Sequence, residues 1–302
     1  MKVSRRDFIK VCGSSAALLG VAAKLAPPDL STRSQSVPTS PRVGNGILID
    51  TSKCIGCKQC QIACMKSHNL PVDDQITHLS PYAPSVVEMR NISADLTHPQ
   101  IQPIKRQCMN CNEPSCVSAC TVGALTKRPD GPVVYDDKRC IGCRYCMYAC
   151  PFGVPTFEWN KQLSLIRKCD GCADRIDQGK IPACAEACPA GALTYGNRND
   201  LLTIAKDRIS TGKGKYVNHV YGETEVGGTS MLYLATVAFE KLGLPTLPDK
   251  SPAEINEAIT HSTPTVAAGM VVALGGIYWL MKRLNAGRVQ SADDDKTLDG
   301  GK

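Results

Sequence analysis

Cysteine is the residue type whose number and spacing could do chemistry in this chain. All but Cys12 of the 17 cysteines among the 302 residues fall into four groups of four. The first and third groups share the spacing C-x2-C-x2-C-x3-C, whereas the second and fourth contain longer inserts. Three thiolates on one tight loop, with a fourth supplied from elsewhere, suit the irons of a cubane cluster. The groups are Cys54, Cys57, Cys60 and Cys64; Cys108, Cys111, Cys116 and Cys120; Cys140, Cys143, Cys146 and Cys150; and Cys169, Cys172, Cys184 and Cys188.

Zinc and disulfides are the alternative uses of so many cysteines. Zinc prefers four ligands in C-x2-C pairs and gains nothing from a third cysteine at the same spacing, and a disulfide framework needs no such spacing. No C-x-x-C-H haem motif occurs, and the five histidines stand apart from the cysteine groups in the sequence. Metal content and colour would separate a zinc or disulfide protein from an iron-sulfur protein.

Two-cluster ferredoxins supply a rule for combining such groups. In them, the cysteine that precedes a proline ligates the neighbouring cluster and not its own. Only a short segment separates Cys120 from Cys140, so we expect the second and third groups to form one module. The first and fourth groups then pair around it, which nests one module inside the other. The alternative is a linear arrangement, in which the first group pairs with the second and the third with the fourth.

The nested arrangement predicts which cysteines share a cluster. Each of four [4Fe-4S] clusters receives three thiolates from one group and one from the partner group. The predicted sets are Cys54, Cys57, Cys60 and Cys188 (set 1); Cys64, Cys169, Cys172 and Cys184 (set 2); Cys108, Cys111, Cys116 and Cys150 (set 3); and Cys120, Cys140, Cys143 and Cys146 (set 4).

The N-terminus carries the pattern of an export signal. The run Ser4-Arg5-Arg6-Asp7-Phe8-Ile9-Lys10 precedes an apolar stretch that is too short to span a bilayer. It resembles a twin-arginine signal peptide, and a chance basic helix is the alternative. That route exports folded protein, as the resemblance implies, so clusters inserted in the cytoplasm would protect their thiolates from oxidation in the periplasm. We expect residues 1–26 to be this signal, removed together with Cys12.

An uncharged stretch near the other end predicts a single transmembrane helix at residues 264–281. Tyr278 and Trp279 lie where an aromatic belt forms, and the basic residues that follow from Lys282 favour a cytoplasmic tail at 282–302. We expect the tail to be disordered from Ala286 onward, and the cluster domain to face the periplasmic side of the inner (cytoplasmic) membrane. A buried or interfacial helix is the alternative, because the stretch is short for a membrane span.

Short strands and loops are predicted between the cysteine groups. The fold class is α+β, with two nested ferredoxin-like modules that hold four [4Fe-4S] clusters, followed by the transmembrane helix. Strands are expected at 47–50, 133–135 and 192–195. A core this small depends on iron-thiolate bonds, so we expect the chain not to fold without iron. The predicted boundaries are 46–105 plus 165–200 for the outer module, 106–164 for the inserted module and 201–263 for a connecting segment.

Together these features resemble the four-cluster ferredoxin subunits of membrane oxidoreductases. The residues that carry the likeness, besides the cysteine groups, are the N-terminal signal, the run Cys140-Ile-Gly-Cys-Arg-Tyr-Cys-Met147, the run Val220–Thr229, the run Leu242-Gly-Leu-Pro245 and the terminal helix. The HybA type, the electron-transfer subunits of membrane-bound nickel-iron hydrogenases, is the most similar, and formate dehydrogenase beta subunits are the alternative. Thr121 departs from the family pattern, which has proline after the last cysteine of the second group.

The resemblance implies that the chain passes electrons from a periplasmic hydrogenase catalytic subunit, or a formate dehydrogenase one, to a quinone-reactive integral membrane subunit. The sequence contains no P-loop, no G-x-G-x-x-G motif and no Ser-His-Asp arrangement, so we expect no catalytic site of its own. A stand-alone iron-sulfur enzyme is the alternative, which a turnover assay would test. The net charge of +7 is spread along the chain without an aromatic-interleaved basic stripe, which argues against a nucleic-acid partner.

Overall fold

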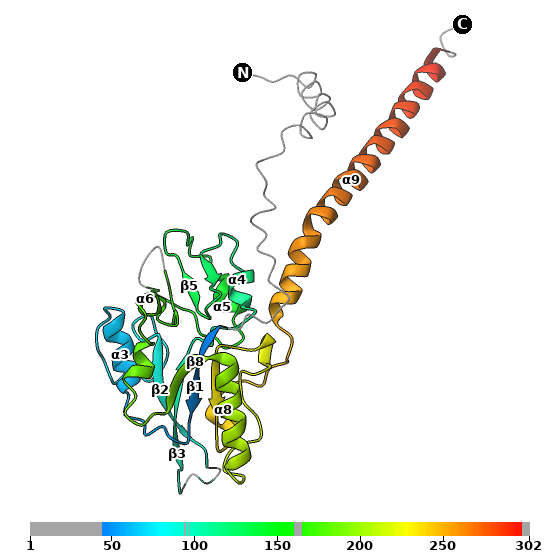
Figure 1. The fold of residues 1–302 in the computed structure, drawn as a ribbon. Helices are drawn as coiled ribbons and strands as arrows, with labels where there is room; N and C mark the ends of the chain where they lie inside the picture. Colours follow the sequence, from blue (N-terminus) through cyan, green and yellow to red (C-terminus); the bar gives the residue numbers. More distant parts are fainter. Residues whose placement is uncertain (1–43, 94, 96, 160–164, 298–302) are drawn as a thin grey trace. The chain divides into compact units, whose positions relative to one another are not determined.

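A three-stranded sheet lies at the centre of the computed structural model, which describes residues 44–93, 95, 97–159 and 165–297 (Figure 1). Strand β1 (Asn45–Asp50) pairs antiparallel with β8 (Leu193–Asn197) and parallel with β9 (Met231–Leu234). Because β1 precedes the first cysteine group and β8 follows the last, their pairing brings the two ends of the cysteine-rich region together. The expected signal peptide at 1–26 lies outside the described residues.

One face of this sheet packs against a helix, and the other packs against the segments that carry the cysteines. Helix α8 (Arg198–Thr211) covers one face, where its Leu201 and Ala205 pack with Leu48 of β1 and Leu232 of β9. Asn197 caps this helix by accepting the backbone N–H of Asn199 at 2.9 Å. Since both faces are covered, β1 is buried almost without interruption and its sequence does not alternate.

The opposite face of the sheet packs against the cysteine-bearing segments. Ile47 and Ile49 of β1 share one apolar core with Cys108, Cys169 and Cys184. The sheet is therefore the common support for cysteines of the second and fourth groups.

Three hairpins and five short helices carry or flank the cysteines. The hairpin of β2 (Ser85–Asn91) and β3 (Ile101–Gln107) is the longest, and the sequence analysis did not foresee it. The other two are much shorter: β4 (Leu125–Lys127) with β5 (Val133–Tyr135), and β6 (Thr156–Phe157) with β7 (Ile166–Arg167). The helices are α3 (Gln59–Ser67), α4 (Ser115–Ser118), α5 (Tyr145–Ala149), α6 (Ala173–Asp177) and α7 (Ala183–Glu186).

The strands expected at 47–50, 133–135 and 192–195 lie in β1, β5 and β8. The segment 201–263 is more than the connector that its sequence suggested. It supplies most of α8, strand β9 and two 3-10 turns, η2 (Glu225–Gly227) and η3 (Phe239–Leu242). Buried side chains of this segment complete the core beside the cysteines, because β9 lies directly against β1.

Helix α9 (Pro252–Thr297) ends the described chain. Its start follows from its sequence, because the Ser251 hydroxyl accepts the backbone N–H of Ala253 at 3.1 Å and proline suits the first helical position. The helix runs through Pro264, and the span Pro252–Arg283 contains an 18-residue window with a mean hydropathy of 1.6, so it is long and apolar enough to cross a membrane. The expected disorder from Ala286 onward is wrong as far as Thr297, since the helix continues to that residue.

Candidate iron-sulfur centres

The described part of the chain contains every cysteine of the four groups, and all sixteen are free thiols. Fourteen are buried or half-buried. Cys57 and Cys143, the second cysteines of the first and third groups, are exposed. This distribution suits groups that bind something inside the protein while one edge of the first and third loops reaches the surface.

Tight loops place the cysteines at the starts of the short helices. In the first group Gly56 (φ 73°) and Lys58 (φ 56°) are in the left-handed region, and Gly142 (φ 68°) and Arg144 (φ 66°) repeat this in the third group. Each pair flanks the exposed cysteine and curls the chain back on itself, which turns backbone N–H groups toward the loop interior. The loops are therefore suited to surround an anionic sulfur-ligated centre.

Backbone N–H groups point at several of the sulfurs. The amides of Gly142 and Gly171 lie 3.4 Å from the Sγ atoms of Cys140 and Cys169. Two further amides, of Ala124 and Ala192, approach the Sγ atoms of Cys120 and Cys188 at 3.2 and 3.3 Å. Such hydrogen bonds stabilise thiolates and shift the reduction potentials of bound clusters.

The four cysteines of set 1 line one cavity. Cys54, Cys57, Cys60 and Cys188 surround it together with Lys105 and apolar residues. Burial raises the pKa of the Cys60 thiol to about 12, and nearby negative charge on Cys184 and other thiols adds to the increase. Burial also raises the pKa of Cys54. Thiols that are costly to ionise in an apolar cavity fit a site where a cation neutralises them.

The four cysteines of set 3 line a second cavity. Cys108, Cys111, Cys116 and Cys150 enclose it with Lys168 and the apolar residues Pro114 and Phe152, among others. Burial raises the pKa of Cys116 to about 12, and negative charge on Cys108 also raises it. The second and third groups thus contribute to one cavity, as the ferredoxin rule expects.

Sets 2 and 4 are also gathered in space. Burial raises the pKa of Cys172 to about 11, and the thiols that add to this increase are Cys184 and Cys64 of the same set. Burial likewise raises the pKa of Cys146 to about 12, reinforced by Cys120, Cys143 and Cys140. The cysteines of set 2 come from two groups that are distant in the sequence, and those of set 4 come from two neighbouring groups.

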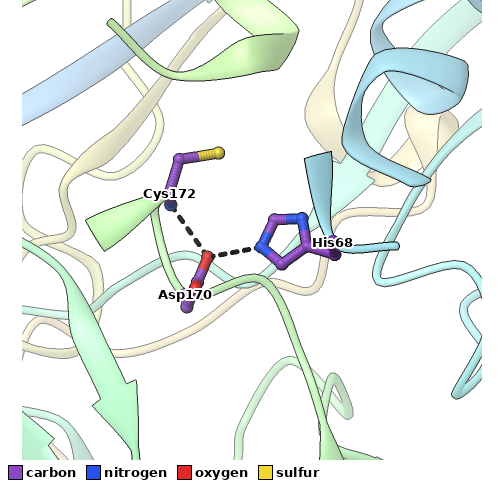
Figure 2. Close-up of side chains that lie close together, drawn as sticks. All are labelled: His68, Asp170 and Cys172. Carbon is purple, nitrogen blue, oxygen red and sulfur yellow. Dashed lines mark hydrogen bonds and ion pairs between the residues drawn. The ribbon is translucent and has the colours of Figure 1, made fainter. Parts of the chain in front are cut away.

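One histidine touches the cysteine-bearing loops, although the sequence analysis left all five histidines apart from them. Figure 2 shows His68, Asp170 and Cys172 side by side. His68 Nε2 lies 3.0 Å from Asp170 Oδ1, and this oxygen also accepts the backbone N–H of Cys172 at 2.8 Å. His68 Nδ1 lies 2.9 Å from the carbonyl oxygen of Cys64. The hydrogen bond to Asp170 raises the pKa of His68 to about 11.

These three side chains could ligate a metal ion, since their ligand atoms lie within 4.8 Å of one another. However, Cys172 and Cys64 both belong to set 2, which is predicted to bind a cluster. We therefore interpret His68 and Asp170 as a hydrogen-bonded pair that joins the end of α3 to the loop of the fourth group. A signal for them was visible in the sequence. Asp170 stands inside Cys169-Asp-Gly-Cys172, and His68 follows Cys64 by one helical turn.

Comparison with known proteins agrees with this geometry. Residues 46–121 and 100–198 each match a family model described as a 4Fe-4S dicluster domain. The chain is 34% identical to the hydrogenase-2 operon protein HybA of Escherichia coli O157:H7, over 97% of this chain and 99% of that protein. It belongs to the HybA-type family of 4Fe-4S ferredoxin subunits.

Two further relatives come from other oxidoreductases of Escherichia coli K12. The iron-sulfur subunit of nitrate-inducible formate dehydrogenase is 32% identical over 82% of this chain and 87% of its own length. The B subunit of anaerobic dimethyl sulfoxide reductase is 39% identical over 52% of this chain and 75% of its own length. The cofactors that this family's domains hold are clusters of the 4Fe-4S type.

Proposed function

We propose that the chain is the electron-transfer subunit between a periplasmic hydrogenase catalytic subunit and a quinone-reactive membrane subunit. Sets 1 to 4 would each hold one [4Fe-4S] cluster, which accepts and releases one electron when bound. The observation that supports this proposal most directly is the gathering of sixteen free thiols into four sets, two of which line separate cavities. The walls of these cavities are largely apolar, and the loops fix the sulfurs.

The four sets follow one another through the molecule. Buried Lys105 is close to thiols of sets 1 and 2, and buried Lys168 is close to thiols of sets 2 and 3. Negative charge on Cys146 of set 4 in turn adds to the increase in the pKa of Cys116 of set 3. With the exposed cysteines Cys57 in set 1 and Cys143 in set 4, this order supports an entry point at one end and an exit at the other.

The start of α9 supports an orientation for this path. Asn256 Nδ2 donates to Ser118 Oγ at 3.1 Å, and the Ser251 hydroxyl donates to the carbonyl oxygen of Glu113 at 2.8 Å. Both acceptors belong to the segment that carries Cys116 of set 3. We therefore place sets 3 and 4 toward the membrane and set 1 toward the catalytic subunit.

A hydrogenase is favoured over a formate dehydrogenase as the partner because the HybA likeness extends over nearly the whole of both chains. The periplasmic location rests on the twin-arginine pattern at residues 1–26 and on the basic residues after the apolar stretch of α9. A formate dehydrogenase partner remains the second candidate, supported by the likeness of its iron-sulfur subunit.

Metal analysis of the complex is the test of this function. Anaerobic purification from membranes is expected to yield about sixteen iron and sixteen acid-labile sulfide per chain, as four cubanes require. A nickel-containing large subunit should accompany it. A molybdenum or tungsten partner would select formate dehydrogenase, and zinc without sulfide would refute the electron-transfer function altogether.

Deleting residues 252–302 is expected to release the protein from the membrane, because this deletion removes the only described helix that is apolar and long enough to span it. The measurement is the distribution of the chain between membrane and soluble fractions, in cells that express it without partner subunits. The matched control deletes only residues 286–302 and should stay in the membrane fraction. Membrane retention of the longer deletion would contradict an anchoring role for α9.

A further inference from the structure

Two lysines are buried between the cysteine sets, where nothing in the amino-acid pattern points to them. Lys105 on β3 is 3% exposed, and Lys168, which follows β7, is 9% exposed. Lysine is rarely buried to this degree unless its charge is compensated. These positions therefore call for a source of negative charge nearby.

Oxygen atoms that act as acceptors hold both ammonium groups. Lys105 Nζ donates to Ser85 Oγ at 2.6 Å and to Gln107 Oε1 at 2.8 Å. Lys168 Nζ donates to the carbonyl oxygen of Cys169 at 3.1 Å and to that of Val133. Within the described residues, no carboxylate forms an ion pair with either lysine. Hydrogen bonds alone do not neutralise the buried charge.

Thiols from two sets supply most of the nearby negative charge at each lysine. Lys105 lines the cavity of set 1. Burial alone would lower its pKa, but negative charge on Cys184 and Cys60, and then on Cys169 and Cys64, outweighs it and raises the pKa. Lys168 lines the cavity of set 3 and donates to the carbonyl oxygen of Cys169 of set 2. Burial opposes its charge in the same way, and Cys108, Cys116 and Cys169, followed by the Asp170 carboxylate, outweigh it. Lys105 therefore lies between sets 1 and 2, and Lys168 lies between sets 2 and 3.

We propose that Lys105 and Lys168 are positioning charges that raise the reduction potentials of the clusters on either side of them. This inference rests on the proposed function, because it needs clusters in sets 1 to 3. A cluster gains one negative charge on reduction, and a fixed positive charge nearby stabilises the reduced form. Because both lysines are buried, this attraction is screened little.

Sharing one lysine between two sets has a further consequence. Adjacent reduced clusters repel each other, so an electron on one lowers the potential of the next. An ammonium group between them offsets this repulsion and raises both potentials together. The two lysines thereby keep successive steps of the path close in energy, whereas set 4, which neither lysine reaches, is left out of this effect.

The test is a redox titration followed by EPR on the anaerobically purified complex that contains Lys105→Met or Lys168→Met. Each substitution is expected to shift the midpoints of two clusters to lower potential. One cluster, that of set 2, should shift in both variants, and that of set 4 in neither. Lys213→Met, which removes the same charge from an exposed turn, is the matched control and should shift none.

Two outcomes would overturn the proposal. If Lys105→Met and Lys105→Gln both retain full iron and unshifted midpoints, the charge does not act on the clusters. If both variants lose iron while Lys105→Arg keeps it, the charge serves assembly and not the potential. Absence of iron from the unmodified protein is a separate result, because it would refute the proposed function itself.

Discussion

Removal of iron is expected to unfold the half of the molecule built from α4, α5 and the hairpins β4–β5 and β6–β7, before the central sheet is lost. The apolar core of that half consists of Leu125, Val133, Phe157 and Ile166 together with Cys146, and further cysteines pack around it. Its strands are two or three residues long. Hairpins of this length are not stable on their own in water, so we expect bonds between cysteine and iron to hold them.

The central sheet has support that does not depend on cysteine. Leu48, Leu201, Leu232 and Leu234 form a separate apolar core between the sheet and α8, and each is 1% exposed or less. Burial of such side chains contributes about 1.5–3 kcal/mol each relative to exposure. The sequence predicted that the whole chain fails to fold without iron. The structure instead leads us to expect that the short hairpins unfold first and the central sheet later.

Hydrogen exchange read by mass spectrometry measures this order. After anaerobic removal of iron, amides of Leu125–Lys127 and Val133–Tyr135 should lose protection at once, and amides of β1 and β9 should lose it later or in part. The control is the same protein carried through the procedure without the chelator. Equal protection of the two regions after complete loss of iron would show that the short hairpins are held by something other than the metal.

The sequence predicted those parts of the site that depend on spacing. Cysteines separated by two residues predict cluster ligation because the geometry of their loop depends only on neighbouring residues. The strands at 47–50 and 133–135 were predicted from their apolar and β-branched composition. Assigning the cysteines to sets required only the ferredoxin rule, in which each group supplies one cysteine to the cluster of its partner group. The structure places the thiols of each set together, and iron binding by those sets remains our proposal.

Parts of the site that depend on burial could not be predicted. Lys105 and Lys168 look like ordinary surface lysines in the sequence, because their importance comes from the thiols packed around them in three dimensions. His68 is close to Asp170 only because α3 packs beside the loop of the fourth group. Strand β9 was also not predicted, because its short apolar run pairs with β1, which lies far away in the sequence.

Pairs of cysteine substitutions are expected to separate the nested arrangement from the linear one by counting clusters. Cys57→Ser combined with Cys188→Ser removes two ligands of set 1 if the modules are nested. One cluster is then lost, and about twelve iron atoms per chain remain. In the linear arrangement the same two cysteines belong to different clusters, so two clusters are lost and about eight iron atoms remain.

The reciprocal pair makes the comparison decisive. Cys57→Ser combined with Cys120→Ser should cost two clusters in the nested arrangement, because Cys120 then belongs to set 4, but only one in the linear arrangement. Spin integration of the fully reduced protein counts the clusters, and Cys57→Ser alone gives the baseline.

The nested outcome is expected because Cys188, not Cys120, lines the cavity that holds Cys54, Cys57 and Cys60. Negative charge on Cys188 also adds to the effect of burial in raising the pKa of Cys54, as a neighbour in one site would. If the first pair loses two clusters and the second pair loses one, the assignment of all four sets must be exchanged for the linear one.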